Sequence, residues 1–210
     1  MPSLAMFQWA IRDKEQKDGR RYSFIVADYN PTVLQLVTLP NLILSWAVLE
    51  KARVPALRDA FASDDELELT PEVLESFQSF LLGKQISLAF LSGAWSQELV
   101  DMIYDNPSAE PANTLTLLLG AETIYSPFAL AAFTETMFSI LERERKQGGH
   151  NEATAYIAAK RLYFGVGGSL DDFVDVAQSR GGIIDHLREE TEGVRRGVVR
   201  CSLAETEDST

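Results

Sequence analysis

Short apolar runs alternate with amphipathic stretches along most of the 210 residues. Apolar runs bounded by turn residues are typical of buried strands, whereas apolar positions three and four residues apart are typical of helices. The sequence predicts buried strands at 24–27, 86–91, 114–119 and 153–159. Two further runs, 183–184 and 198–203, are expected to form a last, antiparallel pair of strands.

The first well-marked helix is expected directly after the first strand. Asn30 supplies an N-cap and Pro31 a proline at the first helical position. Leu34 and Val37 follow at helical spacing. Pro40 is expected to break or kink this helix, because proline lacks the N–H that the helix needs.

Three later helices are expected to begin near Pro71, Pro127 and Ser169, the last with a Ser169–Asp172 cap. Each places apolar residues on one face. In order along the chain, these faces are expected to contain Leu74, Phe77 and Leu81; Leu130, Phe133, Met137, Phe138 and Leu141; and Phe173, Val176 and Ala177.

Strands that alternate with helices predict an α/β fold with a mostly parallel sheet. The run 114–119 is nearly all apolar, so we expect it in the middle of a parallel sheet that is covered on both faces. Residues 1–203 are expected to form one domain. Within it, 53–85 is interpreted as an insertion with an acidic, solvated first half, and 204–210 as a disordered tail.

Composition limits the possible partners. The formal net charge is −12, and an acidic surface repels phosphate backbones, so nucleic-acid binding is not expected. Cys201 is the only cysteine, which excludes a disulfide framework and fits a reducing compartment. The first residues lack the positive charge of a signal peptide. Polar residues interrupt the apolar stretch 32–49, so no membrane span is expected.

The ends of the expected strands carry the residues best suited to chemistry, because ligands of open α/β sheets bind beyond the carboxyl ends of the strands. Asp28 stands where a carboxylate accepts hydrogen bonds from ribose hydroxyls, or else caps the next helix. Gly93 allows backbone to approach a ligand. Trp95 offers a face for stacking on adenine, or else is an ordinary core residue.

Glu122 follows the apolar run 114–119 directly. A carboxylate in this place acts as a general base or binds substrate, or else holds a loop by bonding backbone amides. The glycines between Gly165 and Gly168 miss the dinucleotide pattern, because Leu170 stands where the third glycine belongs. A tight turn that borders an active site is expected there. No metal-ligand spacing and no nucleophile elbow are present, so no metal is expected.

Taken in order, these segments resemble the protein-histidine methyltransferase family of class I, seven-strand methyltransferases. The matching segments are Ala27 to Asn30, Val37 to Asn41, Ser92 to Trp95, Glu122 to Tyr125, Ala158 to Lys160 and Tyr163 to Gly168. The resemblance implies a Rossmann-like, mostly parallel sheet with an antiparallel C-terminal strand. It also implies S-adenosyl-L-methionine as cofactor and a histidine of a protein, notably a ribosomal protein, as substrate. Localisation would be cytoplasmic, nuclear or both, and the oligomeric state is left open.

The resemblance also implies roles for single residues. Three groups would bind the cofactor: Ala27, Asp28 and Tyr29 at its ribose; Gly93, Ala94 and Trp95 beside its adenine; and Ala121 in the lining of its pocket. Glu122 and Tyr125 would face the substrate. The substrate channel would be bordered by Tyr163, Phe164 and Gly165.

The chain departs from the family pattern in two places. Ala94 stands where the family usually has an acidic residue between glycine and tryptophan, so a contact to the adenine amine is in doubt. The family's first strand and its L-x-L-G-C-G-x-G loop precede its first long helix. Residues 1–5 resemble the beginning of that helix, so the strand and the loop are expected to be missing. Three alternatives follow: a non-catalytic interaction protein of the same fold, a lysine-directed methyltransferase, and a nicotinamide-dependent oxidoreductase. The last shares Asp28 but lacks the glycine fingerprint.

Overall fold

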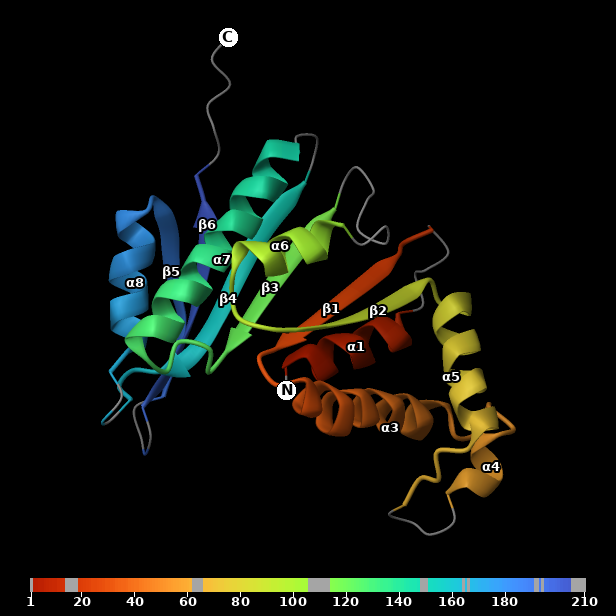
Figure 1. Cartoon of the computed structure of the whole chain (residues 1–210). Coiled ribbons are helices and arrows are strands. Elements are labelled where there is room, and N and C mark those ends of the chain that lie inside the picture. Colours follow the sequence, from red (N-terminus) through yellow and green to blue (C-terminus); the bar gives the residue numbers. More distant parts are fainter. Residues whose placement is uncertain are drawn as a thin grey trace. The chain divides into compact units, whose positions relative to one another are not determined.

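A computed structural model of the chain describes residues 2–13, 19–61, 66–105, 114–147, 151–163, 165, 167–190, 193 and 195–204. The chain divides into two compact units, Met1–Gly93 and Ala94–Thr210, which are coloured from red to yellow-green and from green to blue in Figure 1. The expectations of one domain over 1–203 and of an insertion at 53–85 stay predictions. The tail from 205 onward lies outside the described residues.

The first unit contains two parallel strands and the helices that pack against them. Its elements are α1 (Pro2–Arg12), β1 (Tyr22–Asp28), α2 (Pro31–Val33), the π-helical turn η2 (Leu34–Thr38), α3 (Leu39–Glu50), α4 (Leu57–Ala60), α5 (Pro71–Gly83) and β2 (Ile86–Ser92). The strands β1 and β2 pair in register from Tyr22 opposite Ile86 to Asp28 opposite Ser92. This pairing confirms the expected strands at 24–27 and 86–91.

Aromatic side chains join the helices of the first unit to its strands. The ring of Phe7 in α1 packs edge-on against Phe24 in β1, with 5.7 Å between ring centroids. Trp46 in α3 lies 5.2 Å from Phe77 in α5. Helix α5 buries Val73 together with Phe77, whereas Leu74 is 39% exposed. The prediction that Leu74 faces the core is therefore wrong, because the buried face is rotated by one residue.

The helical run from Pro31 to Glu50 begins as expected, with the Asn30 side chain accepting a hydrogen bond of 2.9 Å from Thr32 N. The expected break at Pro40 does not occur. Leu39 N donates to Leu34 O, five residues back. This π-turn widens the helix just before the proline ring, which would otherwise clash with the preceding turn. The helix therefore continues through Pro40 into α3.

This run is also the one helix in the described part of the chain that is long and apolar enough to cross a membrane, with 20 residues and a mean hydropathy of 1.7. The expectation that no segment meets this test is wrong, because the polar residues within the run are too few to lower its mean. Leu42, Ile43, Trp46 and Ala47 nevertheless lie in the core of the first unit.

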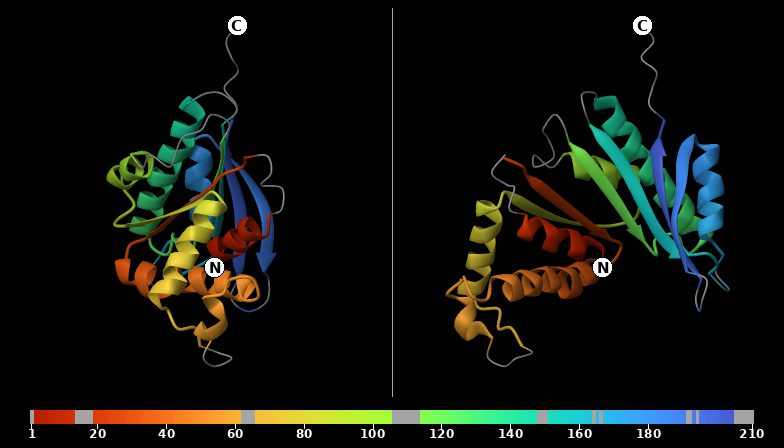
Figure 2. Two further views of the ribbon diagram at one scale, coloured as in Figure 1. Left: turned by 90° about the vertical axis from the view of Figure 1, so that its right-hand side faces the viewer. Right: turned by 180° about the vertical axis from the view of Figure 1, so that it is seen from behind.

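The second unit is a four-stranded sheet with helices packed on it (Figures 1 and 2). Its elements are α6 (Gln97–Tyr104), β3 (Leu115–Ala121), α7 (Pro127–Gln147), β4 (Glu152–Lys160), α8 (Leu170–Ser179), β5 (Gly182–Glu190) and β6 (Arg196–Leu203). The strand order is β3-β4-β6-β5. Strands β3 and β4 are parallel, whereas β6 is antiparallel to β4 and β5. The expected α/β fold, with parallel strands and an antiparallel C-terminal strand, is confirmed.

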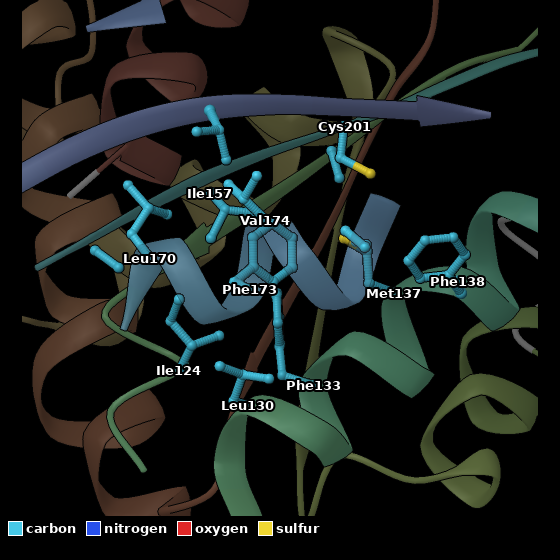
Figure 3. Close-up of a cluster of buried hydrophobic side chains, with 14 of the residues drawn as sticks. Ile124, Leu130, Phe133, Met137, Phe138, Ile157, Leu170, Phe173, Val174 and Cys201 are labelled. Carbon is cyan, nitrogen blue, oxygen red and sulfur yellow. The ribbon is translucent and has the colours of Figure 1, made fainter. Parts of the chain in front are cut away.

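Helices α7 and α8 form the core of the second unit with this sheet, and Figure 3 shows side chains of both helices gathered there. All five residues expected on the apolar face of α7 are buried. Gly120 in β3 allows close packing, because a Cβ atom there would lie 2.6 Å from Phe133 Cζ. In α8 the expected cap is confirmed, with Asp172 N donating to Ser169 Oγ at 2.9 Å. Val176 is 36% exposed and Val174 is buried instead, so the prediction for Val176 is wrong.

Strand β3 lies at an edge of the four-stranded sheet, not in its middle as expected. Leu115 is 62% exposed, and Leu117 and Leu119 are also exposed. Leu118 and Gly120 point to the opposite face, which packs on α7. An apolar sequence indicates that a strand can be buried on both faces but does not specify its neighbours. The strand expected at 114–119 is therefore confirmed, but its expected place in the middle of the sheet is wrong.

Candidate active site

A pocket of about 190 Å³ lies in the second unit at the carboxyl end of β3. Ala121 and Glu122 line it from β3, and Ala158 and Ala159 line it from β4. Charged side chains of β5 and β6 complete the wall. The carboxyl ends of parallel strands are where ligands of this fold class bind, so the pocket is the candidate active site.

Glu122 is held in an unusual backbone conformation at the mouth of the pocket. Its φ is +57°, in the left-handed region that disfavours residues with a Cβ atom. Glu122 N donates a hydrogen bond of 2.9 Å to Ala158 O, which ties the turn to β4. A strained residue that its surroundings hold in place is typical of functional sites.

The Glu122 carboxylate accepts a hydrogen bond on each oxygen. Tyr163 Oη donates to Oε2 at 2.7 Å, and Arg196 Nε donates to Oε1 at 3.1 Å. Both donors are side chains, so Glu122 does not hold its loop through backbone amides of the described residues. The carboxylate has further lone pairs free to accept a hydrogen bond from a ligand.

Tyr163 is buried, and its hydroxyl also accepts a hydrogen bond of 3.3 Å from Lys160 N. Burial, and after it the hydrogen bond to the neighbouring Glu122 carboxylate, raises the pKa of Tyr163 to about 12. The phenol therefore keeps its proton at neutral pH and acts as a donor to Glu122.

Arg196 is a site residue that sequence reasoning missed. It lies 74 residues after Glu122, at the first position of β6. The antiparallel register between β4 and β6 places it opposite Lys160 at the end of β4, and from there its side chain reaches Glu122. Nothing local in the sequence around Arg196 indicates this neighbour, because the register is set by the whole strand pair. A second ion pair, between Arg188 Nη2 and Glu190 Oε1 at 3.6 Å, lies in the same wall.

The glycine-rich turn after β4 packs against the loop that follows Glu122. Gly168 has a φ of +86°, and a Cβ atom there would lie 2.7 Å from Ile124 O. The two loops therefore touch, and glycine is required at this contact. Gly165, with a φ of +81°, lies in the same turn, whereas Phe164 lies outside the described residues. Tyr125 is 53% exposed on the facing loop.

The first unit brings together Asp28 and Gly93, where Gly93 N donates to Asp28 O at 3.3 Å. Asp28 Oδ1 accepts a hydrogen bond of 2.8 Å from Asn30 N, and among the described residues its other oxygen accepts none. Asn30 caps the following helix, so Asp28 is free of that task. Ala27 precedes Asp28 in β1, and Tyr29 is 75% exposed.

The remaining residues expected at the cofactor, Ala94, Trp95 and Ala121, belong to the second unit. The Trp95 ring packs edge-on against Phe133, 5.5 Å between centroids, on the core of that unit. This packing is that of a core residue. Gly93 has a φ of +150°, and a Cβ atom there would meet nothing within 4 Å, so its conformation favours glycine without any close contact in the structure.

No group of histidine, cysteine, aspartate and glutamate in the described ranges is arranged to hold a metal ion. No family model matches the sequence. The chain is 34% identical over 184 residues to histidine protein methyltransferase 1 of Saccharomyces cerevisiae, an alignment that covers 82% of this chain and 45% of the relative. The chain belongs to the protein-histidine methyltransferase family.

Other members of the family match with lower identity. Histidine protein methyltransferase 1 of Schizosaccharomyces pombe is 31% identical over 72% of this chain and 39% of its own length. The homolog of Bos taurus is 27% identical over 73% of this chain and 35% of its own length. The chain thus spans less than half the length of the curated relatives it matches.

The Rossmann-like α/β fold that the family resemblance implied is confirmed by the parallel strand pairs and the antiparallel last strand. A solved structure, the delta-N METTL16 MTase domain, overlays with a TM-score of 0.40 at 11% identity, covering 96% of this chain and 82% of that chain. The fold is defined by the strand order and by the pairing of the strands within each unit.

Proposed function

We propose that this chain forms the catalytic region of an S-adenosylmethionine-dependent protein methyltransferase that acts on a histidine side chain. The observation that carries the proposal is the Glu122 carboxylate, which Tyr163 and Arg196 hold at the mouth of a pocket at the carboxyl end of β3. The curated relatives, named as histidine protein methyltransferases, favour histidine over lysine as the target.

The end of β1 fits the ribose of the cofactor. Asp28 has one oxygen engaged by Asn30 N and, within the described residues, one without a donor, as a carboxylate that binds a ribose hydroxyl requires. Ala27, Tyr29 and Gly93 would lie beside it. S-adenosylmethionine supplies a methyl group that is already activated on a sulfonium. The task left to the protein is alignment and control of protons.

Glu122 performs this task for the substrate. Its carboxylate accepts the N–H of the target imidazole and so fixes which ring nitrogen carries the proton. The other nitrogen would then carry the lone pair that takes the methyl group, with S-adenosylhomocysteine as the leaving group and the N–H proton lost to solvent. Tyr163 donates to Oε2 and keeps the carboxylate from rotating, because both oxygens are tied. Tyr125, half-exposed beside this point, would contact the substrate chain.

The protein substrate is proposed to be a ribosomal protein, met in the cytoplasm or the nucleus. The net charge of −12 supports a basic partner of this kind, since opposite charges steer association.

A second candidate function is a non-catalytic interaction protein of the same fold. The observation that favours it is the position of β3 at the edge of the four-stranded sheet, where its three exposed leucines would accept another strand. Charged residues or prolines, which commonly protect an edge strand, are absent from β3.

Isothermal calorimetry of the folded chain with S-adenosylmethionine separates the two functions. Micromolar affinity, lost in Asp28→Ala, supports the enzyme. No binding by a folded sample contradicts the methyltransferase function for this chain and favours the interaction protein.

A further inference from the structure

We propose that the pocket at the end of β3 is built to hold its target imidazole uncharged, and that Arg196 is the positioning residue that achieves this by pairing with Glu122. The inference rests on the proposed function and concerns the same site. It assigns a role to Arg196, and it defines the bound side chain as a neutral hydrogen-bond donor.

The charged side chains that line the pocket form two ion pairs. Glu122 pairs with Arg196 at 3.1 Å, and Glu190 pairs with Arg188 at 3.6 Å. Among the described residues, Tyr163, which keeps its proton, also contacts Glu122, and Lys160 Nζ lies 5.4 Å from the Tyr163 ring centroid. The lining thus carries two carboxylates and two guanidiniums, and Lys160 adds a positive charge near Tyr163, so the negative charge of Glu122 is opposed at the position of a bound ring.

The pairing of Arg196 with Glu122 resolves two opposing requirements on the carboxylate: it must orient the imidazole ring without favouring its protonation. A lone carboxylate that accepts an imidazole N–H orients the ring, but it also favours the protonated, charged ring. A protonated ring has no lone pair left to receive a methyl group. The guanidinium of Arg196 opposes the charge of Glu122 while leaving lone pairs of the carboxylate free. Glu122 therefore still orients the imidazole ring, while Arg196 reduces the tendency of the ring to become protonated.

The backbone fixes Arg196 at the required place. Strand β6 lies between β4 and β5, so both of its edges are hydrogen-bonded. The next residue, Gly197, packs so closely that a Cβ atom there would lie 2.6 Å from Leu170 Cδ2. Arg196 itself is about half-exposed, at 48% of its side-chain surface, so solvent weakens its field. We therefore expect that loss of the Arg196 charge changes the pKa of the bound imidazole by about one, not by several.

The test uses the full chain without cofactor and a short histidine-containing peptide with a ¹⁵N-labelled imidazole as the probe. NMR titration gives the pKa of the bound imidazole. The wild type is expected to hold it close to the value of the free peptide. Arg196→Gln is expected to raise it by about one unit, and Arg196→Lys to return it toward the wild-type value, because the charge is restored.

The matched control is Arg200→Gln. Arg200 lies on the same strand and forms an ion pair with Asp185 at 2.7 Å, outside the pocket lining. This variant is expected to leave the imidazole titration unchanged. The proposal is overturned if Arg196→Gln leaves the bound imidazole with its wild-type pKa, if Arg200→Gln shifts it equally, or if the peptide does not bind.

The two proposals fail in different ways. If the chain binds S-adenosylmethionine and methylates the peptide while Arg196→Gln leaves the imidazole titration unchanged, the role of Arg196 is wrong and the proposed function stands. If Arg196→Gln shifts the titration but no methyl transfer occurs, the role of Arg196 stands and the proposed function is wrong.

Discussion

Tyr163 Oη donates a hydrogen bond of 2.7 Å to Glu122 Oε2 and thereby joins two loops that lie 41 residues apart in the sequence. One loop follows β3 and the other follows β4, two parallel neighbours. The bond fixes the orientation of the carboxylate on which the proposed chemistry depends. It also makes the phenol a reporter of the site, because its ionisation responds to Glu122.

Replacing this tyrosine tests its part in positioning. Tyr163→Phe is expected to lower kcat/KM for methyl transfer by about tenfold and stability by about 1 kcal/mol. The control is Tyr104→Phe, because Tyr104 donates a similar bond of 2.7 Å to Glu144, between α6 and α7. Tyr104→Phe should lower the urea midpoint similarly but leave kcat/KM unchanged. If both variants lost the same activity, Tyr163 would only stabilise the fold and would not position the Glu122 carboxylate.

Alkaline pH should weaken the fold through the same bond. The folded-state pKa of Tyr163 is raised to about 12, above the ordinary tyrosine value of 10.0. Its contribution to stability is therefore fully present below pH about 10 and is lost as the pH rises through about 12. Tyr163→Phe should flatten the loss of unfolding free energy over this range. Spectrophotometric titration of Glu122→Gln should show one tyrosine whose pKa falls toward the ordinary value; an unchanged titration would contradict the contact.

The contact between the two active-site loops has its own paired test. Gly168→Ala is expected to cost about 3 kcal/mol, because its φ is positive and its Cβ atom would lie 2.7 Å from Ile124 O. Gly165→Ala has a similar φ but open space around the Cβ atom, so it should cost only about 1 kcal/mol. Urea unfolding followed by circular dichroism measures both. Equal costs would mean that the loops do not touch.

Asp28 should matter for the cofactor and little for the fold. Asp28→Asn keeps an acceptor for Asn30 N but removes the charge and an acceptor offered to a ribose. The affinity for S-adenosylmethionine should fall by about tenfold or more in calorimetry. Asp185→Asn, in the second unit, is the control and should bind as the wild type does. An unchanged affinity in Asp28→Asn would remove Asp28 from the cofactor site.

The strands of the fold could largely be predicted from apolar runs, but their positions could not. The run 114–119 indicated a buried strand, yet β3 lies at an edge, because the neighbours of a strand are set by chain topology. The second half of β5 was missed entirely. Its charged residues from Asp185 to Glu190 pair with β6 at the other edge of the sheet, where exposure removes any apolar alternation.

The residues of the candidate site also fall into those that the sequence could predict and those that it could not. Glu122 could be found because it follows an apolar run, and Tyr163 came from the family resemblance. Arg196 could not be found, since its nearness to Glu122 depends on the register of β6 against β4 across 74 residues. In α8, Val176 was expected to face inward, but Val174 is buried in its place. Leu170 and Phe173 lie on the same buried face as Val174.

Methyl transfer itself is the most direct test of the proposed function. The full chain is incubated with S-adenosylmethionine carrying an isotope-labelled methyl group and with a ribosomal protein fraction, and the digested proteins are analysed by mass spectrometry. Labelled methylhistidine should appear with the wild type and fall by about 100-fold with Glu122→Ala, while Tyr104→Phe gives the wild-type yield. Label on lysine alone, no label with a folded sample, or an undiminished yield from Glu122→Ala would contradict the proposed function of this site.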